Sequence, residues 1–333
     1  MTRYIVTGAA GHLGSTIVRA LLERGQQVSG LILSGEQPVV SGPEYIKGNV
    51  MDLESMSPLF QRREDENLIV IHTAGLIDVT GAMIERLHSI NVNGTQNILT
   101  LSRKHHVEKL LYVSSVHAIP ECNIPTIQTE IRGFSPENVI GGYAKSKAEA
   151  TQAVLDAAAA GLPAVVVHPS GIIGPYDEGR NHLVQLVKDF MEGRLPVCVG
   201  GGYDFVDVRD VADGCILATE RGRIGECYLL TGGYYRIKEI LELIADLCGR
   251  NAPPVLPMLL VRMAEPILGL WSRYQGRRPL YTRYSLDTLR SPMRFSSEKA
   301  AKELGYHTRH IQITIQDTLK WLQEHSLAKT MEA

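Results

Sequence analysis

The sequence is poor in features that mark several classes of protein. It holds five cysteines, and no two of them form a CxxC pair. This pattern argues against a disulfide framework and against a zinc site, and it suits a reducing cytosol. Neither sign of charge dominates, because the chain has 34 basic and 36 acidic side chains. We therefore expect no nucleic acid, no acidic polymer and no bound metal as a partner of this chain.

The chain also shows no internal repeat, no low-complexity tract and no basic leader followed by an apolar stretch. We therefore expect no secretory signal and a cytoplasmic protein. The most apolar run, 253–271, has about the length of a membrane helix. Prolines and charged residues interrupt it, so we expect no membrane span. A lid over an apolar substrate, a subunit contact and a shallow membrane attachment all fit this run.

What the sequence does contain is a glycine-rich turn between a strand and a helix at its start. Bulky apolar residues predict a strand over Arg3–Thr7, and Gly8, Gly11 and Gly14 follow at regular spacing. From Leu13 on, apolar residues recur at helical spacing. In this context the glycines permit a tight turn, the approach of a pyrophosphate and close packing of the helix. The helix N-terminus then faces the phosphates, so this stretch predicts a dinucleotide site. A glycine-rich turn without a ligand is the alternative.

The GxxGxxG spacing and the segment TGAAGHLGS resemble the extended branch of the short-chain dehydrogenases/reductases. The resemblance implies that Ala10, His12 and Leu13 join the three glycines in binding the cofactor.

The end of a second predicted strand, about Gln27–Leu33, is where the ribose of adenosine would bind. An acid there favours NAD, and an arginine favours a 2′-phosphate. The chain offers Ser34 there, with neither an acid nor an arginine from Ile32 to Gly35. Because Ser34 can hydrogen-bond a phosphate, the expectation leans slightly towards NADP, and NAD stays open.

Two further strand ends carry candidate cofactor contacts. Asp52 and Leu53 follow a strand predicted over Tyr45–Lys47, and the resemblance implies that this pair meets the adenine. A helix cap is the usual role of such an aspartate. The apolar segment Leu68–His72 predicts a buried parallel strand. It ends in small residues that let a ligand approach the backbone, namely Thr73, Ala74 and Gly75.

Serine and asparagine candidates for the active site follow. A helix predicted over Met83–Arg103 carries Asn91 in the segment NVNGT, which resembles the family's NVxGT stretch, where the first asparagine supports the active site. The strand Leu110–Ser114 brings Ser114 and Ser115 to the carboxyl end of the sheet, where ligands bind in open α/β folds. The alternatives are an asparagine satisfied within its helix and a turn-forming serine pair.

The segment YAKSK supplies a tyrosine and a lysine at helical spacing. Tyr143 and Lys147 lie four residues apart at the start of an alanine-rich helix, Ala144–Ala160, and therefore point the same way. A nearby positive charge stabilises a phenolate, so we expect the pKa of Tyr143 to fall from about 10 towards neutral pH. Tyr143 is then a candidate proton donor to a ketone, or acceptor from an alcohol. The same spacing recurs at Tyr234 and Lys238, far from the glycine turn, and we interpret it as chance.

A sixth predicted strand, Ala164–His168, leads into the segment HPSGIIGP. The resemblance implies that this stretch borders the nicotinamide, with Pro169 and Ser170 at the cofactor. His168 either touches the ligand or is a buried histidine satisfied by the backbone.

Two charged residues follow in the segment DVRDVA, which is similar to a mostly structural element of the family. Arg209 is expected on the surface, although it can reach an anionic substrate. Asp210 is expected to cap a helix or to form an ion pair.

The alternation of strands and helices predicts an α/β fold: a Rossmann-type doubly wound parallel sheet with a smaller C-terminal α/β substrate lobe. We place the NAD(P)-binding domain at 1–175, with about 204–232 returning to it. The substrate lobe occupies mainly 176–333 and includes a helix predicted over about His182–Met191.

The resemblance spans about residues 2–325 and is to the NAD-dependent epimerase/dehydratase family. It is strongest to dihydroflavonol-reductase-like and 3β-hydroxysteroid-dehydrogenase-like members. It implies hydride transfer between a nicotinamide and a secondary alcohol or ketone, on a small, apolar or sugar-like substrate.

The resemblance also implies the residue roles. Tyr143 would be the general acid/base, and Ser115 would hold the substrate oxygen. Lys147 would lower the tyrosine pKa and bind the nicotinamide ribose, and Asn91 would orient a proton-relay water. The family pattern also implies a homodimer through helices 83–103 and 144–160.

Two other functions stay open. The first is a nucleotide-sugar epimerase or dehydratase with tightly bound NAD. The arginines after residue 170 form no clear diphosphate clamp, and Ser115 is followed by Val116 and His117 where dehydratases commonly carry an acidic pair. The second is a non-catalytic NAD(P)-sensing protein. Such proteins typically lose the tyrosine or the lysine, and this chain keeps both.

Overall fold

The computed structural model describes residues 1–62, 65–78, 84–121, 126–177, 181–263, 280, 282–290 and 293–332. Its centre is a seven-stranded sheet with the order β11-β7-β5-β4-β1-β2-β3, in which all neighbouring strands are parallel. These strands are β1 (Thr2–Thr7), β2 (Gln27–Ile32), β3 (Glu44–Lys47), β4 (Asn67–His72), β5 (Lys109–Val113), β7 (Ala164–Pro169) and β11 (Cys227–Leu230). The predicted doubly wound parallel sheet is confirmed.

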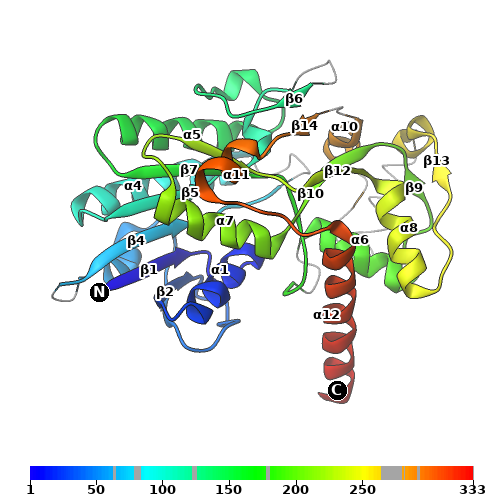
Figure 1. Ribbon diagram of the computed structural model, residues 1–333, viewed down its shortest axis with the longest axis horizontal. Coiled ribbons are helices and arrows are strands. Elements are labelled where there is room, and N and C mark those ends of the chain that lie inside the picture. The colour runs from blue at the N-terminus through cyan, green and yellow to red at the C-terminus, as the bar shows by residue number, and fades with distance from the viewer. Residues whose placement is uncertain are drawn as a thin grey trace.

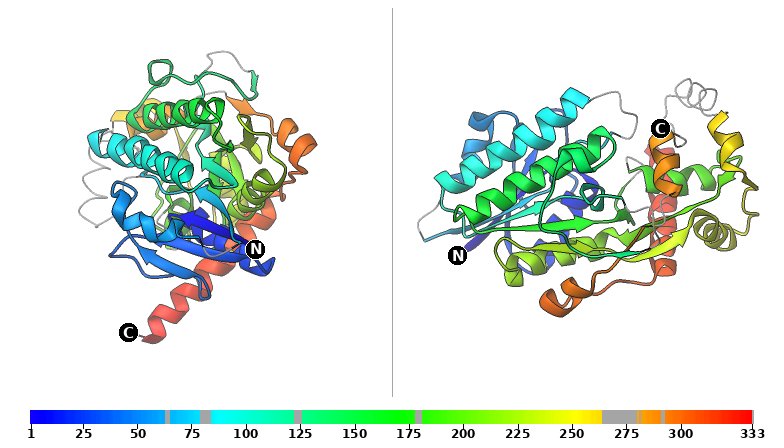
Figure 2. Two further views of the ribbon diagram at one scale, coloured as in Figure 1. Left: turned by 90° about the vertical axis from the view of Figure 1, so that its left-hand side faces the viewer. Right: turned by 90° about the horizontal axis from the view of Figure 1, so that it is seen from above.

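Helices cover both faces of this sheet, as Figures 1 and 2 show. One face carries α1 (His12–Glu23), α7 (Val208–Arg221) and α11 (Glu298–Leu304). The other face carries α4 (Gly94–Lys104), α5 (Gly142–Ala159), the short α2 (Leu53–Met56) with the 3-10 turn η1 (Ser57–Phe60), and α3 (Ile84–His88). Two covered faces explain why the central strands read as continuous apolar runs.

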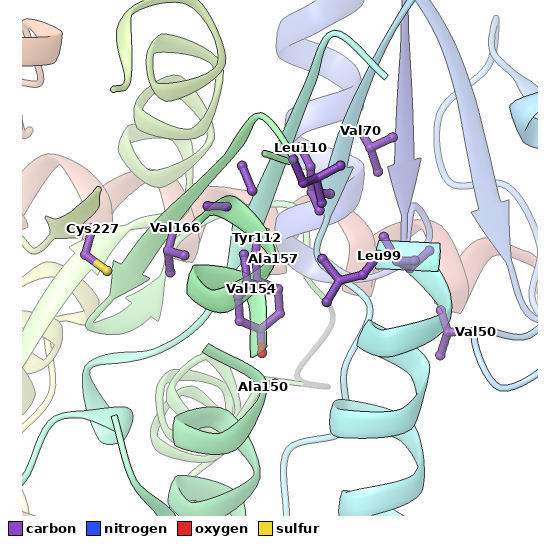
Figure 3. Close-up of a cluster of buried hydrophobic side chains, with 14 of the residues drawn as sticks. Val50, Val70, Leu99, Leu110, Tyr112, Ala150, Val154, Ala157, Val166 and Cys227 are labelled. Carbon is purple, nitrogen blue, oxygen red and sulfur yellow. The ribbon is translucent and has the colours of Figure 1, made fainter. Parts of the chain in front are cut away.

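The side chains of β5 illustrate how the two faces are filled. Leu110 and Tyr112 pack on the α4 and α5 side, whereas Leu111 and Val113 pack on the α1 and α7 side, because successive strand residues point to opposite faces. Figure 3 shows Tyr112 among side chains of α4 and α5, including Leu99 and Val154. The alanines of α5 let this helix approach the sheet closely.

A second lobe, called the substrate lobe after the role expected from the sequence, has a separate core. Its three-stranded sheet has the order β12-β10-β8. The strands are β8 (Gly171–Ile173), β10 (Gly202–Asp207) and β12 (Gly233–Arg236), and the helices are α6 (His182–Met191), α8 (Ile237–Cys248), α10 (Arg283–Arg290) and α12 (Ile311–Glu332). The end of α12 extends away from the rest of the molecule (Figure 1). After β10 the chain returns through α7 and β11 to the central sheet.

Short elements complete the fold. Two two-stranded sheets join β9 (Cys198–Val199) to β13 (Val255–Leu256) and β6 (Ile127–Gln128) to β14 (Arg294–Phe295). The long segment between β5 and α5 also contains the 3-10 turns η3 (Val116–Ala118) and η4 (Pro136–Asn138).

Three expectations are refined. The helix expected over 83–103 contains a π-helical turn, η2 (Ser89–Asn93), between α3 and α4, and Met83 lies outside the described residues. Tyr234 lies in β12 and Lys238 in α8, so the helical spacing that unites Tyr143 and Lys147 does not apply to them.

Of the apolar run 253–271, residues 264–271 lie outside the described part. Within the described part, no helix is both long and apolar enough to cross a membrane.

A buried arginine ties the first strand to its neighbours. Arg3 in β1 binds both carboxylate oxygens of Glu66, at 2.8 and 2.9 Å. It also donates to the Ser29 hydroxyl at 3.1 Å and to the carbonyl oxygens of Leu59 and Gln61 at 3.0 and 2.7 Å. A buried charge pair of this kind is costly to break, because the remaining charge is left without a partner.

We therefore expect Arg3→Ala to lower the free energy of unfolding by about 3–5 kcal/mol, since it leaves the Glu66 carboxylate buried and unpaired. Arg24→Ala is the control, because Arg24 pairs with Asp213 at the surface and its loss costs at most about 1 kcal/mol. Urea unfolding followed by circular dichroism measures both. Equal losses in the two variants would contradict this account of the Arg3 network.

Candidate functional site

The glycine turn after β1 is held in a form that only glycine accommodates. Gly8 has a φ of +69°, and a Cβ there would lie 2.9 Å from Ala74 Cα. A Cβ on Gly14 would lie 2.1 Å from the carbonyl oxygen of Gly8. Gly11 is the N-cap of α1, and no side chain caps this helix end. The first N–H groups of α1 are therefore available to an anion at a cavity edge, as a pyrophosphate site requires.

A cavity of about 730 Å³ starts at this turn, passes the carboxyl ends of the central strands and enters the substrate lobe. It brings together most of the predicted site residues. These are Gly8, Gly11, His12, Leu13, Gly14, Thr73, Ala74, Gly75, Ser115, Tyr143, Lys147, Pro169 and Ser170.

Five predicted residues do not line this cavity. They are Ala10, Ser34, Asp52, Leu53 and Asn91. Ala10 is buried and Ser34 is exposed. Asp52 caps α2, where its side chain accepts from the N–H groups of Glu54 and Ser55, which is the alternative role that the sequence left open.

The cavity wall also includes residues that the sequence reading did not select. Beyond β2 the wall includes Leu33 and Glu36, two positions past Ser34, and the Glu36 carboxylate accepts from Leu33 N at 2.9 Å. After β3 it is the segment 48–51 that lines the cavity. His117 and Tyr203 line the wall near Tyr143. The sequence does carry a signal for Glu36, because it is an acid just beyond the end of a predicted strand. No feature of the sequence near His117 or Tyr203 indicates that these two residues lie together.

Tyr143 and Ser115 lie together in this wall. Burial raises the pKa of Tyr143 to about 12, and a hydrogen bond with the Ser115 side chain opposes this shift. The expected fall of the tyrosine pKa next to Lys147 is therefore wrong for this structure, because burial disfavours the charged phenolate and the pKa of Tyr143 rises instead. Tyr143 is thus protonated at neutral pH and can donate a proton.

Lys147 lies one helical turn from Tyr143 and is buried. Its Nζ donates to the carbonyl oxygen of Val113 at 2.8 Å and lies 5.0 Å from the centre of the Tyr112 ring. Burial lowers the pKa of Lys147 to about 8. A Cβ on Gly75 would lie 3.5 Å from Nζ, so the small residue after β4 leaves room beside the ammonium group.

Asn91 supports the cavity from behind. Its side chain accepts from Leu76 N at 2.7 Å and donates to Leu76 O and to Ser146 Oγ, both at 3.0 Å. Asn91 thereby links the π-helical turn to the segment after β4 and to α5. In this structure its side chain fixes the position of the wall.

Other candidates have structural contacts. His168 is buried, its Nδ1 donates to Ser115 O at 3.0 Å, and its ring stacks on Phe134. Among the described residues its Nε2 has no hydrogen-bond partner, so the backbone satisfies only one of the two ring nitrogens. Arg209 pairs with Asp207 and Asp317 and is not a free surface arginine. Asp210 accepts from Arg309 N at 2.7 Å and pairs with its guanidinium, as expected of an ion-pair partner.

Comparison with known proteins agrees with this geometry. Residues 4–230 match the model of a family described as NAD dependent epimerase/dehydratase. The chain is similar to sterol demethylase protein B of Methylococcus capsulatus, at 30% identity over 97% of this chain and 99% of that protein. It is similar to 4-hydroxy-2-methyl-3-oxo-4-farnesyl-3,4-dihydroquinoline-1-oxide ketoreductase of Stigmatella aurantiaca, at 31% identity over 92% of each.

A solved structure shares the fold. The UDP-glucose 4-epimerase of Thermus thermophilus, in complex with NAD, has a TM-score of 0.76 and covers 96% of this chain and 99% of that chain at 22% identity. At this identity the likeness concerns the fold alone.

The close approach at Gly14 predicts a sharp effect of a single methyl group. Gly14→Ala should weaken dinucleotide binding at least about tenfold, because its Cβ cannot stay 2.1 Å from Gly8 O and the turn must move. Titration calorimetry with NAD and NADP measures this effect. Gly133→Ala is the matched control, since a Cβ there meets no atom within 4 Å. Unchanged affinity in Gly14→Ala would show that the nucleotide does not bind at this turn.

Proposed function

The chain belongs to the NAD-dependent epimerase/dehydratase family, and we propose that it is an extended short-chain dehydrogenase/reductase that interconverts a secondary alcohol and a ketone. The observation that carries this proposal is the meeting of Ser115, Tyr143 and Lys147 in one cavity with the glycine turn.

The roles follow from the chemistry of these side chains. Tyr143 is the general acid that protonates the ketone oxygen, and it is the general base in the reverse direction. Its raised pKa suits the acid, because the phenol carries its proton at neutral pH. Ser115 holds the substrate oxygen next to this phenol. Lys147 binds the nicotinamide ribose. Asn91 acts as a positioning residue, because its amide is bonded to Leu76 and Ser146 and does not line the cavity where a proton-relay water would lie. When bound, the nicotinamide supplies or accepts the hydride.

The residues present fit a dinucleotide. The turn at Gly8–Gly14 and the uncapped end of α1 would hold the pyrophosphate. The small segment Thr73–Gly75 would let the nucleotide approach the backbone after β4. Asn49, Val50 and Met51 would face the adenine.

Glu36 argues for NAD and against the lean towards NADP that Ser34 suggested. Its carboxylate lines the cavity beyond the carboxyl end of β2, where the adenosine ribose binds in this fold. A carboxylate accepts hydrogen bonds from both ribose hydroxyls, and it repels a 2′-phosphate. We therefore propose NAD as the preferred cofactor.

The substrate arm of the cavity supports an apolar substrate over a sugar-like one. Most of the side chains that line it are aliphatic, and α6, α8 and α10 supply many of them. They include Leu183, Leu186, Leu195, Val197, Val199, Leu241, Leu286 and Leu289. Burial of apolar surface is then the main source of substrate affinity. The relative in Stigmatella aurantiaca is named as a ketoreductase of a farnesylated compound, which fits this proposal.

Removal of the transferable proton tests the proposed chemistry. Tyr143→Phe should lower kcat for ketone reduction by about 10²–10⁴, because the general acid is lost. Nucleotide affinity should stay within about threefold, since the ring remains. NADH oxidation with a set of aliphatic and aryl ketones measures the rate. Tyr234→Phe is the matched control, because Tyr234 has the same sequence spacing to a lysine but does not line the cavity. An active Tyr143→Phe enzyme would refute the assignment.

A change at Glu36 tests the cofactor proposal. Glu36→Gln should narrow the preference for NADH over NADPH by about tenfold or more, because the repulsion of the 2′-phosphate is removed. The ratio of kcat/KM for the two cofactors is the measurement. Glu54→Gln is the control, since Glu54 is an exposed acid in nearby α2 that does not line the cavity. A wild-type enzyme that prefers NADPH would contradict the role given to Glu36.

A further inference from the structure

Two polar side chains beside Tyr143 have no part in the proposed chemistry. His117, in the turn η3 after Ser115, and Tyr203, in β10 of the substrate lobe, both line the cavity. The Tyr203 hydroxyl and His117 Nε2 lie 2.8 Å apart and share a hydrogen bond. The two rings are stacked, with centres 5.8 Å apart. They form a bridge between the nucleotide-binding domain and the substrate lobe.

The position of His117 is coupled to the active site itself. Its backbone N–H donates to the Ser115 hydroxyl at 3.3 Å. The edge of its ring meets the Tyr143 ring, with centres 5.9 Å apart and planes at 72°. His117 is therefore a direct neighbour of both side chains that bind the reacting oxygen.

The position of Tyr203 is fixed from the substrate lobe. Its ring packs edge-on against Phe205, with ring centres 6.1 Å apart. On the adjacent strand β8, a Cβ at Gly171 would lie 2.5 Å from the Tyr203 ring, so a glycine there makes room for it. Both members of the pair are thus held by packing, and binding a ligand costs them little rotational freedom.

His117 is neutral at physiological pH, because burial lowers its pKa to about 4. A phenol hydroxyl both donates and accepts hydrogen bonds. If Tyr203 donates to Nε2, its oxygen can accept from a ligand hydroxyl. If Nε2 carries the proton, the phenol hydrogen can be donated to a ligand carbonyl. Either arrangement suits an uncharged oxygen, and neither supplies a cation for a carboxylate.

We propose that His117 and Tyr203 form a specificity site for a second, uncharged oxygen of the substrate, carried on a carbon close to the one that reacts. This inference rests on the proposed function, since the reacting oxygen is taken to lie between Ser115 and Tyr143. The substrate class is then a β-hydroxy ketone or a β-diketone, or the corresponding diol, with an apolar remainder in the leucine-rich arm. The pair thereby selects among apolar ketones, which the aliphatic arm alone discriminates weakly.

Three matched ketones serve as probes: methyl octyl ketone, its β-hydroxy-β-methyl derivative, which is a tertiary alcohol that NAD⁺ cannot oxidise, and the corresponding β-diketone. Their dissociation constants are measured by calorimetry on the enzyme saturated with NAD⁺, in which no ketone can be reduced. Their kcat/KM values are measured separately with NADH. We expect wild type to favour each oxygenated ketone over methyl octyl ketone by about five- to tenfold in both measurements, the usual effect of one buried hydrogen bond.

Tyr203→Phe keeps the ring and removes the hydroxyl. It should reduce this preference to about twofold or less, by weakening the two oxygenated ketones while methyl octyl ketone changes little. His117→Phe should act in the same direction, and the double variant should lose no more than the stronger single variant, because the two residues act as one unit. Tyr235→Phe is the control. Tyr235 lies in β12 directly opposite Tyr203 of β10, but it does not line the cavity.

Two results would overturn the proposal. One is a wild-type enzyme that binds the three ketones equally or binds none of them. The other is a Tyr203→Phe variant that weakens all three ketones alike, which would mark a purely structural tyrosine. Failure of the proposed function has a different signature: the binding preference is present and depends on Tyr203, but NADH reduces none of the ketones.

Discussion

The close packing of backbone on backbone at the first turn is the constraint on which the site depends. The approach of Gly14 to Gly8 places the N-terminus of α1 over the carboxyl end of β1. The hydroxyl of Thr73 donates to Thr7 O at 2.6 Å, and Ala74 N donates to the Thr7 hydroxyl at 3.2 Å, so the end of β4 is held against the same turn. A side chain on either glycine would separate these parts and open the pyrophosphate cradle.

A buried chain of hydrogen bonds connects this turn to α5, the helix that carries Tyr143 and Lys147. Thr7 Oγ1 bonds to His72 Nδ1 at 2.7 Å, His72 Nε2 bonds to Thr95 Oγ1 at 3.1 Å, and Thr95 donates to Asn91 O at 2.6 Å. Burial lowers the pKa of His72 to about 3, so the chain is neutral. Asn91 then reaches Ser146, the neighbour of Lys147. These bonds link the glycine turn to the helix face that carries Tyr143 and Lys147, whereas Tyr203 comes from β10 in the second lobe.

The local parts of this site were predictable from the sequence. Tyr143 and Lys147 are one helical turn apart, so their common direction follows from the helix alone. Contacts between residues far apart in the sequence could not be predicted in this way. The ribose contact was expected at Ser34 and the adenine contact at Asp52. In the structure Glu36 and the segment 48–51 line the cavity and Asp52 caps a helix, because the lengths of the loops after β2 and β3 decide which side chains reach the wall. The sign of the Tyr143 pKa shift also depended on burial, which spacing does not reveal.

The sequence by itself determined the parallel sheet, the glycine turn and the common direction of Tyr143 and Lys147, because these depend on periodicity and on contacts between near neighbours. Only the tertiary structure decided which residues of the second lobe meet the active site. His117 and Tyr203 are 86 positions apart and come together because β10 pairs with β8, next to the end of the central sheet. Contacts of that separation are set by the packing of whole elements, and the sequence around either residue carries no sign of them.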